Sequence, residues 1–258
     1  MASARQAHGR IAAVSTRSTL ILLLALAVSA ASCRGNAMPD GPFTDAATIR
    51  LAEAVERGDA YVVRTLIDEG GDPNAAGDGG LNLLQHAIFK QSKSGLEALL
   101  QAGADPNRPG YGGSSAMHTA SLTDDPAYLE LLLAHGGNPN VAHAGNGETP
   151  LAQAVGPRTS AQFHMLLKAG ADPNAADRTG HTPLHRAAMI NAGTHVLELL
   201  EAGARPGATN ARGSTFQPFY FGIPSNVLNA RAREERQAVI AWLKAHGVPL
   251  EAAVESSG

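Results

Sequence analysis

The sequence predicts an all-α solenoid of about five to six stacked helix-turn-helix repeats, and three observations support this fold class. A five-residue phrase, Gly-Ala-Asp-Pro-Asn in its clearest copies, recurs along the chain at steps of 33, 33, 34 and 33 residues. Its copies begin at Gly70, Gly103, Gly136, Gly170 and Gly203. A second phrase, clearest at 180–188, keeps the same period, and a leucine-rich run of helical spacing precedes each copy of the first. A fixed period in this range is typical of stacked repeats, because each unit buries its apolar face against its neighbours.

The N-terminal segment, residues 1–32, is predicted to be a signal peptide. Arg5, Arg10 and Arg17 form a positive region without an acidic residue, and the 12 residues from Leu20 to Ala31 are apolar except for Ser29. That run is too short to span a bilayer comfortably, and its arrangement after a positive region is typical of a secretory signal.

Cys33, the only cysteine of the chain, directly follows this segment. Its position resembles the lipidation site of bacterial lipoproteins, where the thiol receives a diacylglycerol. Residues 33–42 would then hold the lipidated cysteine and a tether. Because Arg34 follows the cysteine, the resemblance implies the outer membrane, on its periplasmic side. The alternative is ordinary cleavage after Ala30, which would release a soluble periplasmic protein with a free thiol.

The two phrases are predicted to mark the ends and the starts of helices. Gly can take the left-handed conformation just after a helix, and the Pro that follows cannot continue the helix. In the second phrase Thr149 and Thr182 precede Pro and cap a first helix. The repeat domain is expected at 43–250, with a flexible tail at 251–258. The repeats are expected at about 43–76, 77–109, 110–142, 143–176, 177–209 and 210–250.

Taken together, the phrases resemble the ankyrin repeat, which combines a turn, a Thr-Pro-Leu-His-type helix, a Leu-rich helix and a Gly-Ala-Asp-Pro-Asn end. In that family, the slot that His118 and His185 occupy holds an imidazole that bonds backbone groups of the neighbouring repeat. We therefore interpret these histidines as structural rather than as metal ligands. The resemblance also implies a concave protein-binding face, made of turn tips and the exposed ends of first helices.

The side chains on that face are not dictated by the repeat framework, so they are the candidate partner-binding residues. These candidates are Leu81, Phe89, Lys90, Tyr111, Leu122, Glu148, Arg178, His181, Met189, Ile190 and Arg212. The apolar members suggest a partly hydrophobic groove with aromatic anchors, which are common hot spots of interfaces. The alternative is that about half of them pack against a neighbouring repeat.

The sixth repeat is longer than the others, because 44 residues separate Gly203 from the next comparable helix stop at Gly247. It contains an aromatic cluster that precedes a predicted helix at about 231–245. The cluster and its partner in that helix are Phe216, Phe219, Tyr220, Phe221 and Trp242. One interpretation is an aromatic-rich C-terminal cap that covers the apolar end of the stack. The alternative is a partner site.

Catalysis, cofactors and nucleic acid are not expected. The chain has no His-Glu-x-x-His, no cysteine pair and no Gly-x-Ser-x-Gly, so no enzyme, cofactor or metal site is predicted. Without residues 1–32, which carry three Arg and no acid, 17 basic and 23 acidic residues remain. The resulting net charge of −6 disfavours a nucleic-acid partner. A monomer that binds another protein is expected.

Two stretches, 124–140 and 239–248, make the chain similar to ankyrin lipoproteins found beside phospholipase effectors of bacterial type VI secretion. This resemblance implies an immunity protein in the cell envelope whose concave face covers the active-site cleft of a periplasm-acting toxin. The alternative is a periplasmic ankyrin scaffold that supports an envelope enzyme, as in defence against peroxide.

Overall fold

The computed structural model of the protein describes residues 41–251. The predicted signal peptide at 1–32, the lipidation site at Cys33, the tether up to residue 40 and the tail from residue 252 lie outside the described residues.

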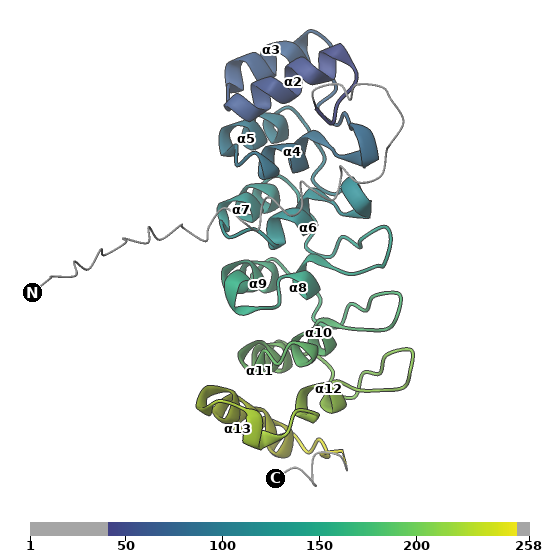
Figure 1. Ribbon diagram of the computed structural model, residues 1–258, viewed down its shortest axis with the longest axis vertical. Coiled ribbons are helices and arrows are strands. Elements are labelled where there is room, and N and C mark those ends of the chain that lie inside the picture. Colours follow the sequence, from purple (N-terminus) through teal and green to yellow (C-terminus); the bar gives the residue numbers. More distant parts are fainter. Residues whose placement is uncertain (1–40, 252–258) are drawn as a thin grey trace, which may run out of the picture. The chain divides into compact units, whose positions relative to one another are not determined.

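The described residues form helix pairs, and the all-α repeat solenoid is confirmed (Figure 1). In the first five pairs the two helices contact each other, whereas the second helix of the last pair packs on the second helix of the pair before it. The pairs are α2 (Ala46–Arg57) and α3 (Ala60–Asp68), α4 (Leu83–Phe89) and α5 (Lys93–Gln101), α6 (Ala116–Ser121) and α7 (Ala127–Ala134), α8 (Pro150–Gln153) and α9 (Ser160–Lys168), α10 (Pro183–Met189) and α11 (Gly193–Glu201), and α12 (Gln217–Phe221) and α13 (Ala230–Ala245).

The first helices stack on one another, because α2, α4, α6, α8, α10 and α12 each contact the next in that order. Turn tips project from one side of this column (Figure 1). Two tips contain a short 3₁₀ turn, at Asp78–Gly80 and Tyr111–Gly113. Among residues 41–251 the only β-type pairing is an isolated bridge between Ala76 and Asn82. Within the same residues, no helix has the length and apolar character needed to cross a membrane.

The predicted helix starts are confirmed by their hydrogen bonds. Thr149 Oγ1 accepts the backbone N–H of Ala152 at 3.4 Å, and the Thr182 N–H donates to His185 Nδ1 at 3.2 Å. Since Nδ1 accepts this hydrogen bond, the neutral ring of His185 carries its hydrogen on Nε2, and this N–H donates to the Ser214 carbonyl at 3.1 Å.

His118 is arranged in the same way, two repeats earlier. Its Nδ1 accepts the N–H of Ser115 at 3.2 Å, and its Nε2 lies 3.0 Å from the carbonyl of Glu148 in the next repeat. Burial lowers the pKa of both His118 and His185, so the neutral form is favoured. Both histidines therefore bridge neighbouring repeats, as the sequence predicted.

The last residue of the five-residue phrase has a second role that the sequence did not reveal. Asn140 Oδ1 accepts the N–H of Asp172 at 2.7 Å, and its Nδ2 donates to the Gly170 carbonyl at 3.0 Å. Asn107 and Asn174 make the same pair of bonds to the repeats that follow them. The phrase therefore ends one repeat and also binds the next.

Replacing Asn140 with Ala should lower the free energy of unfolding by roughly 1–3 kcal/mol. Two hydrogen bonds between repeats are lost, and each contributes about 0.5–1.5 kcal/mol net. Urea unfolding followed by circular dichroism measures the change. Asn226→Ala is the matched control, because Asn226 is exposed outside the repeated phrase. Equal stability of the two variants would contradict this role for Asn140.

The C-terminal cap is also confirmed. Phe216, Tyr220 and Phe221 are buried in the core, where α12 contacts α10. The buried Arg236 of α13 fixes the segment after α12, since its guanidinium donates to the Ile223 carbonyl at 2.7 Å and to the Tyr220 carbonyl at 3.0 Å.

The other two aromatic side chains of this region are only partly buried. Phe219 lies with its ring edge-on to His181 and His185, at centroid distances of 6.1 and 6.2 Å. Trp242 stacks on His246 with centroids 3.8 Å apart. The buried rings thus close the last repeat, while Phe219 and Trp242 remain partly accessible.

Candidate protein-binding face

We define the binding face as the turn tips together with the first helices and the residues that directly follow them. Its clearest feature is an apolar row of four exposed side chains, which come from the second, third and fifth repeats. Leu122 is 53% exposed and Ile190 is 56% exposed, each directly after its first helix. Phe89 and Met189 occupy the last turns of α4 and α10 and are also exposed.

The candidates in the N-terminal half of the face lie partly in contact with their neighbours. Leu81 is half-buried at the end of its turn tip, whereas Tyr111 is exposed. The backbone N–H of Tyr111 donates to Gln85 Oε1 at 2.8 Å, so this tip is held to α4. Lys90 is exposed, and its ammonium pairs with Glu56 of the preceding repeat at 2.9 Å.

Two candidates in the C-terminal half hold neighbouring turn tips together. The guanidinium of Arg178 donates to the carbonyls of Ala144, at 2.7 Å, and Gly145. His181 is half-buried, and its Nε2 lies 3.1 Å from Asn210 Nδ2 in the next tip. Arg212 is exposed. Arg178 and His181 therefore have structural contacts in addition to any contact with a partner.

Glu148, predicted from the sequence to lie on the open binding face, does not lie there in the structure. Glu148 is buried, because the side chain of Arg186 from the next repeat covers it, with Arg186 Nε 2.8 Å from Glu148 Oε1. Gln153 Nε2 donates to the other carboxylate oxygen at 3.2 Å. The residue that reaches solvent here is Arg186, which the sequence analysis did not select. Its slot in the Thr-Pro-Leu-His-x-Ala phrase is where a variable, outward-facing residue could have been sought.

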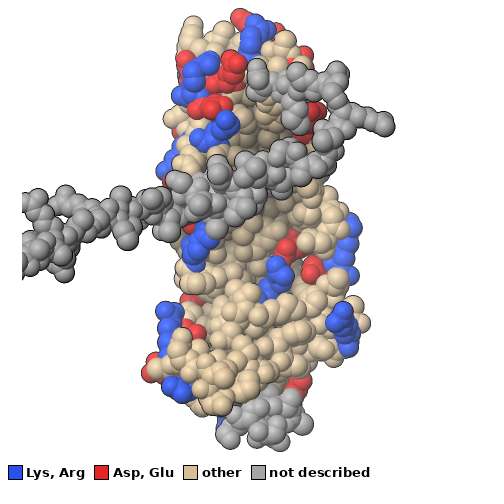
Figure 2. Space-filling model, viewed as in Figure 1, with Lys and Arg blue, Asp and Glu red and all other residues tan. Residues whose placement is uncertain are grey.

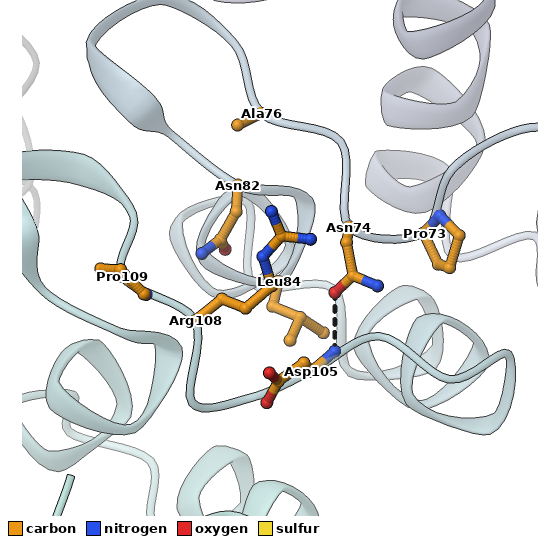
Figure 3. Close-up of a pocket in the computed structure, with 8 residues that line it drawn as sticks. All are labelled: Pro73, Asn74, Ala76, Asn82, Leu84, Asp105, Arg108 and Pro109. Atoms are coloured by element: carbon orange, nitrogen blue, oxygen red, sulfur yellow. Dashed lines mark hydrogen bonds between the residues drawn. The ribbon is translucent and has the colours of Figure 1, made fainter.

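An open hollow of ≈ 270 Å³ lies beside the second helices α3 and α5, away from the binding face, and is lined by Arg64, Ile67, Asp68, Gln101 and Ala102. A smaller cavity, between the first and second repeats, has a volume of ≈ 30 Å³, which is about the space of one water molecule (Figure 3). Its lining residues are Pro73, Asn74, Ala76, Asn82, Leu84, Asp105, Arg108 and Pro109. Asn74 Oδ1 accepts the N–H of Asp105 across it at 2.8 Å. Among residues 41–251, no group of three or more His, Cys, Asp or Glu side chains could hold a metal ion.

Comparison with known proteins agrees with this geometry. A family model described as "Ankyrin repeats (3 copies)" matches residues 51–142 and 117–210. No curated protein matches the chain in sequence. Among solved structures, the chain is similar to the immunity protein Bd3460 in its complex with Bd0816, a predatory endopeptidase from Bdellovibrio bacteriovorus. The two chains are 25% identical, with a TM-score of 0.59 over 72% of this chain and 97% of the other.

Proposed function

Because this chain belongs to the ankyrin-repeat family, we propose that it is a non-enzymatic binding protein of the bacterial cell envelope that neutralises a protein toxin. The observation that carries the proposal is the apolar row, Phe89, Leu122, Met189 and Ile190, which is exposed at the ends of the first helices of the second, third and fifth repeats. Such a row is costly to leave in water and is typical of a surface that a partner covers.

The structural similarity supports the inhibitor class within the family. Bd3460 is an immunity protein in complex with an endopeptidase, and 97% of its chain is covered by the match. We therefore propose the same class of activity here, directed at a hydrolytic toxin of the envelope. A phospholipase effector of type VI secretion is the target that the sequence resemblance favours. The mechanism is steric, since a rigid stack that covers a catalytic cleft needs no chemistry of its own.

The test is neutralisation of a toxin encoded by an adjacent gene. That toxin is directed to the periplasm with and without this chain, and growth is measured. We expect growth to be restored and the two proteins to co-elute in size-exclusion chromatography. Failure of both would refute the proposed function. A deletion strain that is sensitive to peroxide but indifferent to the toxin would favour the scaffold alternative.

Matched surface variants locate the activity. Leu122→Asp and Ile190→Asp each place a charge in the exposed apolar row and should abolish co-elution without unfolding the stack. Tyr61→Asp is the control, because Tyr61 is 74% exposed on α3, a second helix outside the binding face. If Tyr61→Asp weakens the complex as much as the other two variants, the binding surface lies elsewhere.

We further propose that Cys33 anchors the protein to the periplasmic side of the outer membrane. The support is the sequence pattern at 20–34. A Cys33→Ser variant should move from the membrane fraction to the soluble periplasmic fraction. An unchanged distribution of the variant would refute the anchor and leave the binding function standing.

A further inference from the structure

We infer that Arg186 is the central anchor of the binding face and that it receives a carboxylate from an acidic and partly apolar loop of the protein partner. This inference rests on the proposed function, because it names the chemistry of the surface that the partner presents.

Arg186 is held in position before any partner binds. Its Nε lies 2.8 Å from Glu148 Oε1, and Gln153 steadies the same carboxylate through the other oxygen. The Glu148 side chain is 9% exposed, whereas the Arg186 side chain is 46% exposed. The buried acid therefore fixes an exposed cation, which reduces the side-chain entropy lost when a partner binds.

The outer edge of the Arg186 guanidinium remains available. Within the described part of the chain, Nη1 and Nη2 of Arg186 have no hydrogen-bond partner, and the contact to Glu148 involves Nε. A guanidinium offers five N–H donors in a planar fork that matches the two oxygens of a carboxylate. An Asp or Glu side chain of a partner is therefore the chemical group that fits this edge.

The charges around Arg186 favour an acidic partner. The turn tips at 143–148, 177–181 and 210–214 and the helices α8, α10 and α12 carry five charged side chains. These are Glu148, Asp177, Arg178, Arg186 and Arg212. The three arginines are exposed, whereas the Glu148 and Asp177 side chains are only 9% and 16% exposed. A chain of negative net charge thus presents positive groups on this part of its surface, and complementary charge steers association.

The N-terminal half of the face lacks this arrangement. Two of the exposed cations there are paired with exposed acids: Lys90 lies 2.9 Å from Glu56, which is itself about half exposed, and Arg57 lies 3.8 Å from Glu53. Neither pair presents a net charge. A partner carboxylate would meet Glu56 as well as Lys90. The C-terminal half is therefore the part of the binding face that favours an acidic side chain of the partner.

Apolar side chains flank the cation. Met189 and Ile190 lie three and four residues after Arg186, which puts them on the same side of α10. Ile190 Cδ1 lies 4.0 Å from the position that a Cβ on Gly156 would occupy, so this side chain leans towards the preceding repeat. Figure 2 shows a broad uncharged area over the lower, C-terminal part of the face that it draws. Apolar contacts beside an ion pair exclude water and strengthen it, as in interface hot spots.

The test is a selection of random 12-residue peptides, displayed on phage, against the purified full chain. We expect the enriched peptides to share an Asp or Glu next to an apolar residue. Their dissociation constants should rise about 10- to 100-fold for Arg186→Gln, since a charge-assisted hydrogen bond to the peptide is lost. Arg158→Gln is the matched control, because Arg158 is an exposed arginine paired with Asp124 outside the binding face. Its effect should stay within about twofold.

A second variant guards against misfolding, because Arg186→Gln leaves Glu148 without its cation. The double substitution Glu148→Gln with Arg186→Glu removes the buried charge and reverses the exposed one. It should select basic peptides in place of acidic ones, with an unchanged circular dichroism spectrum. Enrichment of basic or uncharged peptides on the unmodified chain, equal binding by the Arg186 and Arg158 variants, or no enrichment at all would each overturn the inference. Neutralisation of the toxin together with any of these outcomes would leave the proposed function intact.

Discussion

Replacing Phe216 with Ala should lower the free energy of unfolding by about 3–5 kcal/mol, the usual loss for a large aromatic side chain removed from a core. Phe216 is fully buried where the last repeat joins the stack. Its removal leaves a cavity where α12 packs on α10. Urea denaturation monitored by circular dichroism measures the loss.

Phe89→Ala is the matched control for this prediction, because the chemical change is the same at an exposed position on the binding face. It should change stability by about 1 kcal/mol or less. Partner binding should show the reverse order. Phe89→Ala should weaken it more than Phe216→Ala, because Phe89 belongs to the apolar row and Phe216 does not reach the surface. A loss of stability for Phe216→Ala that is as small as the loss for Phe89→Ala would show that the cap does not depend on Phe216.

The fold could be predicted from the sequence because its determinants are local and repeated. Each copy of Thr-Pro and of Gly-Ala-Asp-Pro-Asn acts through turn and helix-end chemistry within a few residues, so a period of 33–34 residues defines the whole stack. The cap was also recognisable, since four aromatic side chains within six residues have no place in the regular repeat.

The binding face was harder to predict, because its side chains are directed by contacts between residues more than 30 positions apart. The repeat register predicts an exposed position for Glu148, but Arg186 of the next repeat pairs with its carboxylate and covers it. Arg178 reaches back to the carbonyls of the preceding tip in a similar way. The repeat period predicts the position of a residue within its repeat. The orientation of its side chain also depends on the residues of the neighbouring repeat.

The asparagine of the repeated phrase also makes contacts between repeats that the sequence did not predict. Turn chemistry alone accounts for Asn at this position, yet the bonds of Asn174 run to the backbone at Gly203 and Arg205. The fifth copy of the phrase ends in Gly207, which has no side chain to make such bonds. In the C-terminal cap a different side chain makes a contact between distant segments: Gln217 Nε2 donates to the Pro249 carbonyl at 3.0 Å.

Gly95→Ala should destabilise the protein by roughly 1–3 kcal/mol, although helix propensity alone predicts a gain of about 1 kcal/mol. Gly95 lies in the first turn of α5, where it packs on the end of α2. A Cβ on Gly95 would lie 2.2 Å from the Val55 carbonyl oxygen and 2.7 Å from Ser92 Oγ. Ser92 Oγ in turn donates to that carbonyl at 2.5 Å, so neither neighbour can move without breaking one of the hydrogen bonds between the first two repeats.

Gly207→Ala is the matched control, because no atom lies within 4 Å of its Cβ position and its backbone does not require glycine. The stability of the Gly207→Ala variant should be unchanged or raised by about 0.4–1 kcal/mol.

Since each repeat contacts only its neighbours, the loss of stability from Gly95→Ala should remain local. Amide hydrogen exchange should accelerate in α2 and α3 and stay unchanged in α10 and α11, so the acidic peptides selected on Arg186 should bind the variant normally. Uniform acceleration along the stack would instead show that the repeats unfold as one unit, and a weakened peptide affinity would then follow from Gly95 despite its distance in sequence from Arg186.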